Sequence, residues 1–215
     1  MRTEKSNLII LGAGDHAKIV IATIEAQAEY AILGLIDDNE GKHGTKWYGH
    51  PVLGGVERLP ELKTQGAIHA VVAVGDNTAR ARLTELATEE GFEIVTAVHP
   101  SAVLLSGSTI GKGTVILPLA YVGADTDIGM GAILSVGVMV AHDCMVGDWC
   151  QLCPGARLGG HVRAGDYSFI GMGATVLPSV SVGQESIVGA NAAVREDVPD
   201  SQTVVGVPAR NVGEP

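Results

Sequence analysis

An aliphatic residue recurs at every sixth position from Val98 onward, and this period constrains the fold more than any other feature of the chain. Seventeen consecutive positions share one register without an insertion, and only Ala164 has a small side chain. The series consists of Val98, Leu104, Ile110, Ile116, Val122, Ile128, Leu134, Val140, Val146, Leu152, Leu158, Ala164, Ile170, Val176, Val182, Val188 and Val194. A second series follows four residues after each member of the first, ends at Val198 and contains only small or β-branched residues.

A six-residue period indicates one short strand and one turn per unit, and three units close a triangular coil. Successive coils stack at the inter-strand spacing of about 4.8 Å, with aliphatic side chains inward and small ones at the corners. Because no coil buries its core alone, several must stack. The period therefore predicts a parallel β-helix over residues 98–198. The alternative, a β-rich domain with chance periodicity, is disfavoured by the long unbroken register.

Composition supports a turn-rich repeat and limits the partners. Of 215 residues, 29 are glycine, and 46% are hydrophobic while only 4% are aromatic, which fits a core of stacked aliphatic side chains. The formal net charge of -10 argues against nucleic acid and anionic membranes as partners. Small phosphorylated ligands remain compatible with it, if local amides and a few cations receive them.

The cysteines and the apolar segments indicate a reduced, cytoplasmic setting. There are three cysteines, and we see no pattern of a signal peptide and no apolar run long enough to span a bilayer. Cys144 and Cys150 fall in the inward small-residue series, whereas a zinc site needs convergent ligands. We therefore expect no metal site.

The first half of the chain alternates strand and helix patterns. Residues 8–11 predict a buried strand, Gly12-Ala13-Gly14 a tight turn and Asp15 the start of a helix, a combination that can cradle a phosphate. The full dinucleotide-binding pattern is not met, because Ala17, followed by Lys18, stands where the third glycine could be, so an ordinary turn is the alternative.

Further elements complete a small parallel sheet. We expect a strand over residues 31–39 that ends in Asp37-Asp38, a short helix over 56–63 and a strand over 67–75. Asp76 predicts the cap of a helix that stops at Gly91, and residues 92–98 predict the last strand. The pattern predicts a Rossmann-like α/β domain over 1–97, the β-helix over 98–198 and a tail over 199–215, in which Gly206 and Pro208 exclude further regular stacking.

Both halves together resemble one branch of the left-handed β-helix acyltransferases, the nucleotide-sugar N-acetyltransferases of the bacillosamine and perosamine type and the sialic-acid O-acetyltransferases. The matching segments are GAGDHAK (12–18), LIDDN (35–39), VAVGDNTAR (72–80), AHDCMVGD (141–148), PGARLGGHV (154–162), IGMGATVLP (170–178), IVGAN (187–191) and VVGVPAR (204–210). The resemblance implies left-handed coiling and a homotrimer with an acetyl-CoA site between neighbouring subunits. It implies N-acetylation of the 4-amino group of a UDP- or GDP-linked amino-deoxysugar.

Within this resemblance His142 is the candidate general base and Asp143 the residue that orients it. The adjacent carboxylate fixes one ring nitrogen, so the other can accept a proton. The other histidines are weaker candidates, and His161 lacks an adjacent acid in the sequence. A solvated surface histidine is the alternative for His142, which the match of AHDC to the family pattern disfavours.

The resemblance also assigns the two ligands. For acetyl-CoA it implies the Gly160 amide at the thioester oxygen and contacts along the cofactor from Met172, Gly189, Ala190, Pro208 and Arg210. For the nucleotide sugar it implies Gly12, Gly14, His16, Asp37, Asp38, Gly75, Asn77 and Ser135, with Lys18 and Arg80 adding positive charge.

Two departures from the family pattern affect these expectations. Ser135 stands where bacillosamine-type enzymes have asparagine near the acceptor amine, and Gln151 replaces a second histidine found in many members. O-acetylation of sialic acid therefore stays open as an alternative. A non-catalytic scaffold or nucleotide-sugar sensor is the other alternative, although such a protein needs neither AHDC nor the GVPAR tail.

Overall fold

The computed structural model describes residues 5–212 and divides the chain into two compact units, with the boundary in the sequence between Pro100 and Ser101. Residues 1–4 and 213–215, which belong to the predicted N-terminal domain and tail, lie outside the described residues. Among the described residues, no helix is both long and apolar enough to cross a membrane.

The N-terminal unit is built on a six-stranded sheet in the order β3-β4-β2-β1-β5-β6, parallel except for the β3–β4 pair. Its elements are β1 (Ser6–Leu11), α1 (Asp15–Gln27), β2 (Tyr30–Ile36), η1 (Glu40–Lys42), β3 (Lys46–Trp47), β4 (His50–Gly54), η2 (Val56–Arg58), α2 (Leu59–Thr64), β5 (His69–Val72), α3 (Asn77–Glu89), β6 (Glu93–Ile94) and β7 (Ala97–Val98). The predicted Rossmann-like α/β arrangement is confirmed.

Local chemistry explains where these elements begin and end. The Asp76 carboxylate accepts a hydrogen bond from the Ala79 amide at 2.8 Å and so caps α3 at the predicted residue. The apolar central strands β1 and β5 are almost wholly buried, as expected for a parallel sheet covered on both faces. The single strand expected over residues 92–98 is wrong, because the segment forms two short strands, and only β6 pairs with β5.

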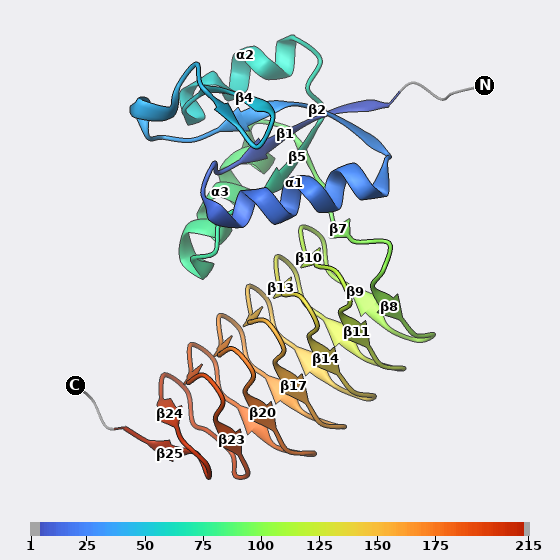
Figure 1. Ribbon diagram of the computed structural model, residues 1–215, viewed down its shortest axis with the longest axis vertical. Helices are drawn as coiled ribbons and strands as arrows, with labels where there is room; N and C mark the ends of the chain where they lie inside the picture. The colour runs from blue at the N-terminus through green and yellow to red at the C-terminus, as the bar shows by residue number, and fades with distance from the viewer. Residues whose placement is uncertain (1–4, 213–215) are drawn as a thin grey trace. The chain divides into compact units, whose positions relative to one another are not determined.

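The second unit is a left-handed parallel β-helix whose coils stack from β8 to β24 (Figure 1). The strands of each coil belong to three sheets, which we call faces 1, 2 and 3. Face 1 contains β10 (Val115–Ile116), β13 (Ile133–Leu134), β16 (Gln151–Leu152), β19 (Phe169–Ile170), β22 (Ile187–Val188) and β24 (Thr203–Val205). Face 2 contains β8 (Val103–Leu104), β11 (Tyr121–Val122), β14 (Met139–Val140), β17 (Arg157–Leu158), β20 (Thr175–Val176) and β23 (Ala193–Val194). Face 3 contains β9 (Thr109–Ile110), β12 (Asp127–Ile128), β15 (Met145–Val146), β18 (Arg163–Ala164) and β21 (Ser181–Val182).

The six-residue series occupies the interior of this prism. Val122, Val140, Leu158 and Val176 follow one another on face 2, and all are 0% exposed. Parallel pairing joins each to its neighbour eighteen residues away, which is one coil. Leu104, in the first coil, is the exposed exception.

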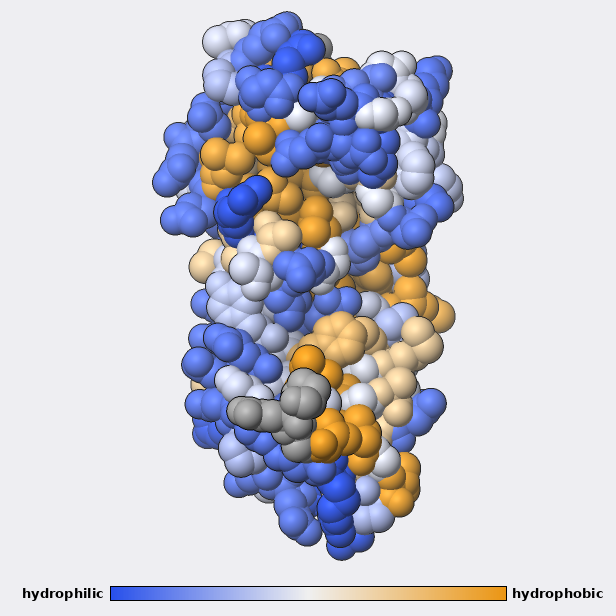
Figure 2. Space-filling model, turned by 90° about the vertical axis from the view of Figure 1, so that its left-hand side faces the viewer, coloured by the Kyte–Doolittle hydropathy of each residue, from blue (hydrophilic) through white to orange (hydrophobic). Residues whose placement is uncertain are grey.

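Some apolar side chains lie on the outer surface of the β-helix, where orange residues stand beside blue ones (Figure 2). They include Leu119, Met139, Met145 and Met172. Scattered apolar residues are normal on a protein surface, so they do not by themselves mark an interface.

The stack extends beyond its predicted end. β24 pairs in parallel with β22, with Val204 opposite Val188, and β25 (Arg210–Asn211) then returns antiparallel to β24. The pairing spans sixteen residues rather than eighteen, so the six-residue register does not reveal it. Gly206 and Pro208 follow this last parallel strand rather than preventing it.

The interior series predicts a large loss of stability on truncation. We expect Leu158→Ala to lower the free energy of unfolding by about 2–5 kcal/mol, because a rigid stack closes poorly around the cavity. The neighbouring Arg157 points outward and is exposed, so Arg157→Ala is the matched control and should change stability by less than about 0.5 kcal/mol. Urea denaturation followed by circular dichroism measures both, and similar midpoints for the two variants would contradict the assigned register.

Candidate active site

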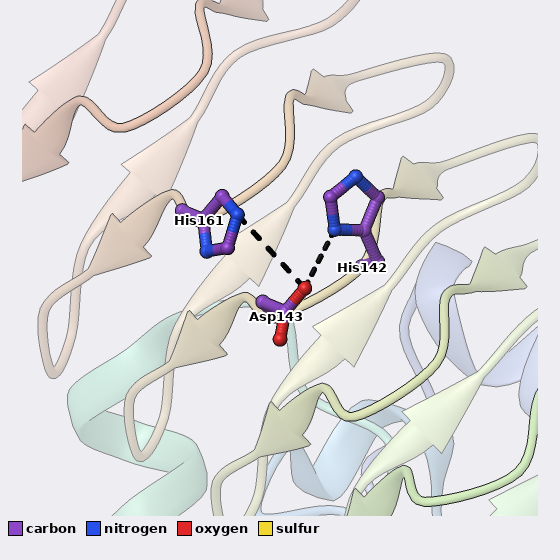
Figure 3. Close-up of side chains that lie close together, drawn as sticks. All are labelled: His142, Asp143 and His161. Atoms are coloured by element: carbon purple, nitrogen blue, oxygen red, sulfur yellow. Dashed lines mark hydrogen bonds and ion pairs between the residues drawn. The ribbon is translucent and has the colours of Figure 1, made fainter.

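His142 and Asp143 lie at the corner between faces 2 and 3, in the turn that joins β14 to β15. Asp143 has a left-handed backbone with φ of 56°, which aspartate tolerates better than most residues. The His142 and Asp143 side chains are 61% and 46% exposed, so the pair faces outward from the prism. His142 Nδ1 lies 2.6 Å from Asp143 Oδ2 (Figure 3).

This hydrogen bond sets the protonation of the ring. An ionised carboxylate can only accept, so His142 Nδ1 carries the hydrogen and donates it to Asp143. The lone pair then resides on Nε2, which is the nitrogen able to take up a proton. The arrangement is that of a general base held by an adjacent acid.

His161 joins this pair from the next coil. It follows Asp143 by eighteen residues, and its Nε2 lies 4.0 Å from Asp143 Oδ2. The rings of His142 and His161 meet edge to face, with centroids 5.3 Å apart. His161 has no adjacent acid in the sequence, as stated above, but the fold brings Asp143 of the preceding coil beside it. The eighteen-residue spacing was the signal that could have found it.

Gly160 packs directly against the imidazole. A Cβ atom at this position would lie 2.8 Å from Cε1 and 2.9 Å from Nε2 of His142. The Gly160 carbonyl accepts from the Ser179 amide at 2.9 Å, which fixes the local backbone. Glycine is therefore required here for the ring to keep its position. Its predicted role at the thioester oxygen remains a prediction.

The predicted acetyl-CoA contacts other than Gly160 lie elsewhere on the same chain. Met172, Gly189 and Ala190 are in turns between faces 1 and 2, as is Ser135, whereas His142 is at the corner between faces 2 and 3. The remaining two predicted acetyl-CoA residues, Pro208 and Arg210, follow β24 in the chain. A single chain thus does not bring these residues to one corner. Gln151 lies on face 1, in β16.

In the N-terminal unit, Asp37 organises the end of β2. Its Oδ2 accepts from the Ala13 amide at 2.8 Å and from Lys42 Nζ at 3.0 Å, and its Oδ1 accepts from the Asn39 amide at 3.0 Å. Burial alone would raise the pKa of this carboxyl, but these hydrogen bonds outweigh it, and the pKa is lowered. Sequence reasoning missed Lys42 because η1 folds it back over the turn.

A cavity of about 190 Å³ lies beside this turn, lined by Gly12, Asp37, Asp38 and Val74 among others. Gly12 has φ of 107°, and a Cβ there would meet the Ala73 carbonyl at 2.9 Å. Its amide donates to the Ile36 carbonyl at 2.7 Å. The amides of Gly12 and Ala13 thus donate hydrogen bonds within the chain, whereas the sequence predicts that this turn can cradle a phosphate.

The cations near the turn also differ from expectation. Arg80 is only 1% exposed, and its guanidinium donates to the Gly75 carbonyl at 3.1 Å and to Asn77 Oδ1 at 2.8 Å, so it stabilises the start of α3 rather than adding surface charge. Lys18 is exposed and pairs with Asp15 at 2.8 Å. Lys18 and Lys42 both approach the ring of Trp47, at 5.2 and 5.6 Å from its centroid.

His16, in the first turn of α1, is held neutral. Burial, and after it the nearby positive charge of Arg80, lowers its pKa from 6.5 to about 4. Its Nε2 is buried and has no hydrogen-bond partner among the described residues. The His16 imidazole therefore carries no charge at neutral pH.

This shift predicts how stability depends on pH. Between about pH 6.5 and 4 the unfolded chain protonates His16 whereas the folded chain does not, so stability falls as the pH drops through this window. The contribution amounts to roughly 3 kcal/mol at full effect. We expect His16→Asn to reduce the fall in the free energy of unfolding over this pH range. The control His50→Asn, which removes a histidine paired with Glu25, should show the same fall as wild type. Urea titrations at pH 7 and pH 4.5 give the free energy of unfolding of each variant. If this free energy falls between the two pH values by the same amount in His16→Asn as in wild type, the assignment is refuted.

Comparisons with known proteins identify relatives of both units. The family model of the PglD N-terminal domain matches residues 7–87. The UDP-N-acetylbacillosamine N-acetyltransferase of Bacillus subtilis (strain 168) is 35% identical over 115 residues, and the match spans 52% of this chain and about half, 51%, of that curated relative.

Solved structures match over nearly the whole chain. A mutant of the GDP-perosamine N-acetyl transferase from Caulobacter crescentus, in complex with CoA and GDP-perosamine, is 38% identical with a TM-score of 0.93, over 97% of this chain and 98% of that one. The acetyltransferase domain of PglB from Neisseria gonorrhoeae FA1090, in complex with acetyl coenzyme A, is 32% identical with a TM-score of 0.90, over 97% of this chain and 100% of that one.

Proposed function

Because the chain belongs to the nucleotide-sugar N-acetyltransferases that join a PglD-type N-terminal domain to a left-handed β-helix, we propose that it transfers the acetyl group of acetyl-CoA to an amino sugar. The acceptor is the 4-amino group of a UDP- or GDP-linked amino-deoxysugar. The observation that carries the proposal is the outward-facing pair of His142 and Asp143, with their 2.6 Å hydrogen bond, at an exposed corner of the β-helix.

In the proposed reaction His142 Nε2 accepts a proton as the sugar nitrogen attacks the thioester carbonyl carbon. The new C–N bond forms, and the carbonyl oxygen becomes an oxyanion that the Gly160 amide stabilises. Collapse breaks the C–S bond, and the proton on His142 passes to the departing CoA thiolate. Asp143 holds the ring and stabilises its protonated form, as its hydrogen bond to Nδ1 supports.

The surface at the corner between faces 1 and 2 is suited to acetyl-CoA. Met172 is 59% exposed, and Ala190 is also exposed beside Gly189, which suits the apolar parts of a pantetheine arm. Arg210 is exposed in β25 and can meet phosphate. We therefore assign Met172, Gly189, Ala190, Pro208 and Arg210 to acetyl-CoA, and Gly12, Gly14, His16, Asp37, Asp38, Gly75, Asn77 and Ser135 to the nucleotide sugar.

The division of the site between two corners supports a homotrimer of parallel prisms. In a ring of three, the 2–3 corner of one copy faces the 1–2 corner of the next, and each groove holds one acetyl-CoA. This arrangement unites His142 with the Met172 side of the site, which a single chain leaves apart.

Subunit complementation tests this assembly. His142→Asn removes the base, and Ala190→Trp blocks the groove from the opposite corner, so each homotrimer should be inactive. Mixed trimers from co-expression should regain about a quarter of wild-type activity, because one groove in four then combines an intact base with an intact neighbour. No recovery, with mixing confirmed by mass spectrometry, would show that each chain holds a complete site.

The acceptor is tested by incubating the enzyme and acetyl-CoA with a panel of UDP- and GDP-linked 4-amino sugars, sialic acid and CMP-sialic acid, and resolving the products by mass spectrometry. We expect an N-acetylated nucleotide sugar. The relatives in the comparisons, named for UDP-N-acetylbacillosamine and GDP-perosamine, favour this result over O-acetylation of sialic acid. Binding without release of CoA would instead support a scaffold or sensor.

A further inference from the structure

The corner that carries His142 and Asp143 also gathers the donor set of a metal site. His142, Asp143 and His161 each offer one ligand atom, and these atoms lie within 4.8 Å of one another. The three side chains are 61%, 46% and 59% exposed, so the position between them is open to solvent. Both rings lie beside the same carboxylate (Figure 3). Two imidazoles and a carboxylate suit zinc and leave one coordination position open.

The spacing of the three donors is close to what zinc requires. With each ligand about 2.0–2.2 Å from the metal, the ligand atoms of a tetrahedral ion lie about 3.4 Å apart. The distance from Asp143 Oδ2 to His142 Nδ1 is 2.6 Å, and that to His161 Nε2 is 4.0 Å. Small rotations of exposed side chains bring both distances to the required value.

The backbone holds the donors in place. The His161 amide donates to the His142 carbonyl at 3.1 Å, and the Asp143 amide donates to the Ala124 carbonyl at 3.0 Å. These are bonds between successive coils, so the three Cα positions belong to one rigid stack. A metal ion would therefore meet a preformed set of ligands rather than having to order a loop.

We propose that His142, Asp143 and His161 form a binding site for a divalent transition metal ion, zinc in particular, and that occupancy inhibits the enzyme. The ion replaces the hydrogen on His142 Nδ1, so the hydrogen of the neutral ring moves to Nε2. Nε2 is the atom that takes up the proton of the attacking amine, and it can no longer accept one. The inhibition rests on the function proposed above, whereas the binding does not.

Cobalt(II) tests the binding directly, because tetrahedral cobalt has visible absorption bands and takes zinc sites. The untagged, metal-free chain is titrated with cobalt chloride, and we expect one ion per chain. His161→Asn suits the left-handed backbone at this position, where φ is 61°, and should weaken binding by at least about tenfold. His50→Asn, which removes a histidine outside the cluster, is the matched control and should bind cobalt as wild type does.

Zinc inhibition is measured with each variant's own metal-free rate as its reference. We expect saturating zinc to lower the wild-type rate at least about tenfold, with EDTA restoring it, and His161→Asn to need a correspondingly higher zinc concentration. The acetylated sugar is quantified by chromatography, because the thiolate of released CoA itself binds zinc.

Each outcome decides one part of the proposal. No cobalt binding by wild type, or equal binding by wild type and His161→Asn, overturns the site. Binding that leaves the rate unchanged overturns the inhibition. A metal-free chain that acetylates none of the amino sugars refutes the proposed function, and the cobalt titration still decides on the site.

Discussion

Replacing His142 by asparagine is expected to lower kcat/KM for acetyl transfer by about 100- to 10,000-fold, the range typical of a lost general acid–base group. The reason is geometric as well as chemical. Asp143 fixes the hydrogen on Nδ1, so Nε2 is the nitrogen that accepts a proton at this corner. Asparagine fits the turn but offers no basic nitrogen. Initial rates at several concentrations of the nucleotide sugar measure the effect.

Two further variants serve as a comparison and a control for His142→Asn. Asp143→Asn keeps an oxygen that can accept from Nδ1 but removes the negative charge, so its loss of activity should be smaller than that of His142→Asn. His50→Asn, in the N-terminal unit, should match wild type. Because His142 is 61% exposed, its replacement should shift stability by less than about 0.5 kcal/mol. Near-normal turnover by a folded His142→Asn protein would end the assignment of the base.

Gly160→Ala is expected to lower kcat/KM by about 100-fold, because a displacement of about 1 Å at the reacting groups has effects of this size. The added methyl group would lie 2.8–2.9 Å from the imidazole of His142, closer than real Cβ contacts allow. The exposed ring is the part that can move, so it rotates away from the groove while the backbone stays. Kinetics and thermal denaturation together separate loss of position from loss of fold.

Gly111→Ala provides the contrast for this experiment. A Cβ at Gly111 would lie 2.4 Å from the Gly129 carbonyl carbon and the Met130 amide nitrogen, which are backbone atoms that cannot rotate away. We expect this variant to lose about 1–3 kcal/mol of stability through overpacking. Gly160→Ala should keep the wild-type melting temperature. An active Gly160→Ala enzyme would show that the ring has room that the structure does not indicate.

The repeat could be predicted from the sequence because one side chain in six decides it. Val140 and Leu158 occupy equivalent positions in successive coils. Both are buried and must be aliphatic, whereas the residues beside them vary. Asp76 likewise identified the start of α3 through local capping chemistry. These are signals that act over a few residues or through one strict period.

What was missed depends on contacts between coils or on burial. His161 meets Asp143 only because eighteen residues make one turn of the stack. Arg80 is a charged residue on a helix, and nothing in the neighbouring sequence shows that its guanidinium folds back onto the Gly75 carbonyl. β24 was not predicted because it pairs with a strand sixteen residues away rather than eighteen. The contacts to acetyl-CoA and to the nucleotide sugar remain predictions from the family resemblance.

Because equal coils stack on one another, the length of the prism can change without a change in the geometry of the catalytic corner. The groups at the catalytic corner come from two successive coils, and β20, which begins at Thr175, lies beyond both of them. Duplicating the eighteen residues of a later coil would therefore lengthen the prism by one rung and leave the spacing of His142, Asp143 and His161 unchanged. Inserting one residue between Asp143 and His161 would instead turn every later side chain to a different direction. An added whole coil therefore preserves the catalytic corner but moves the proposed acetyl-CoA residues after β22 one coil further from it, whereas an inserted fraction of a coil disrupts the stack itself.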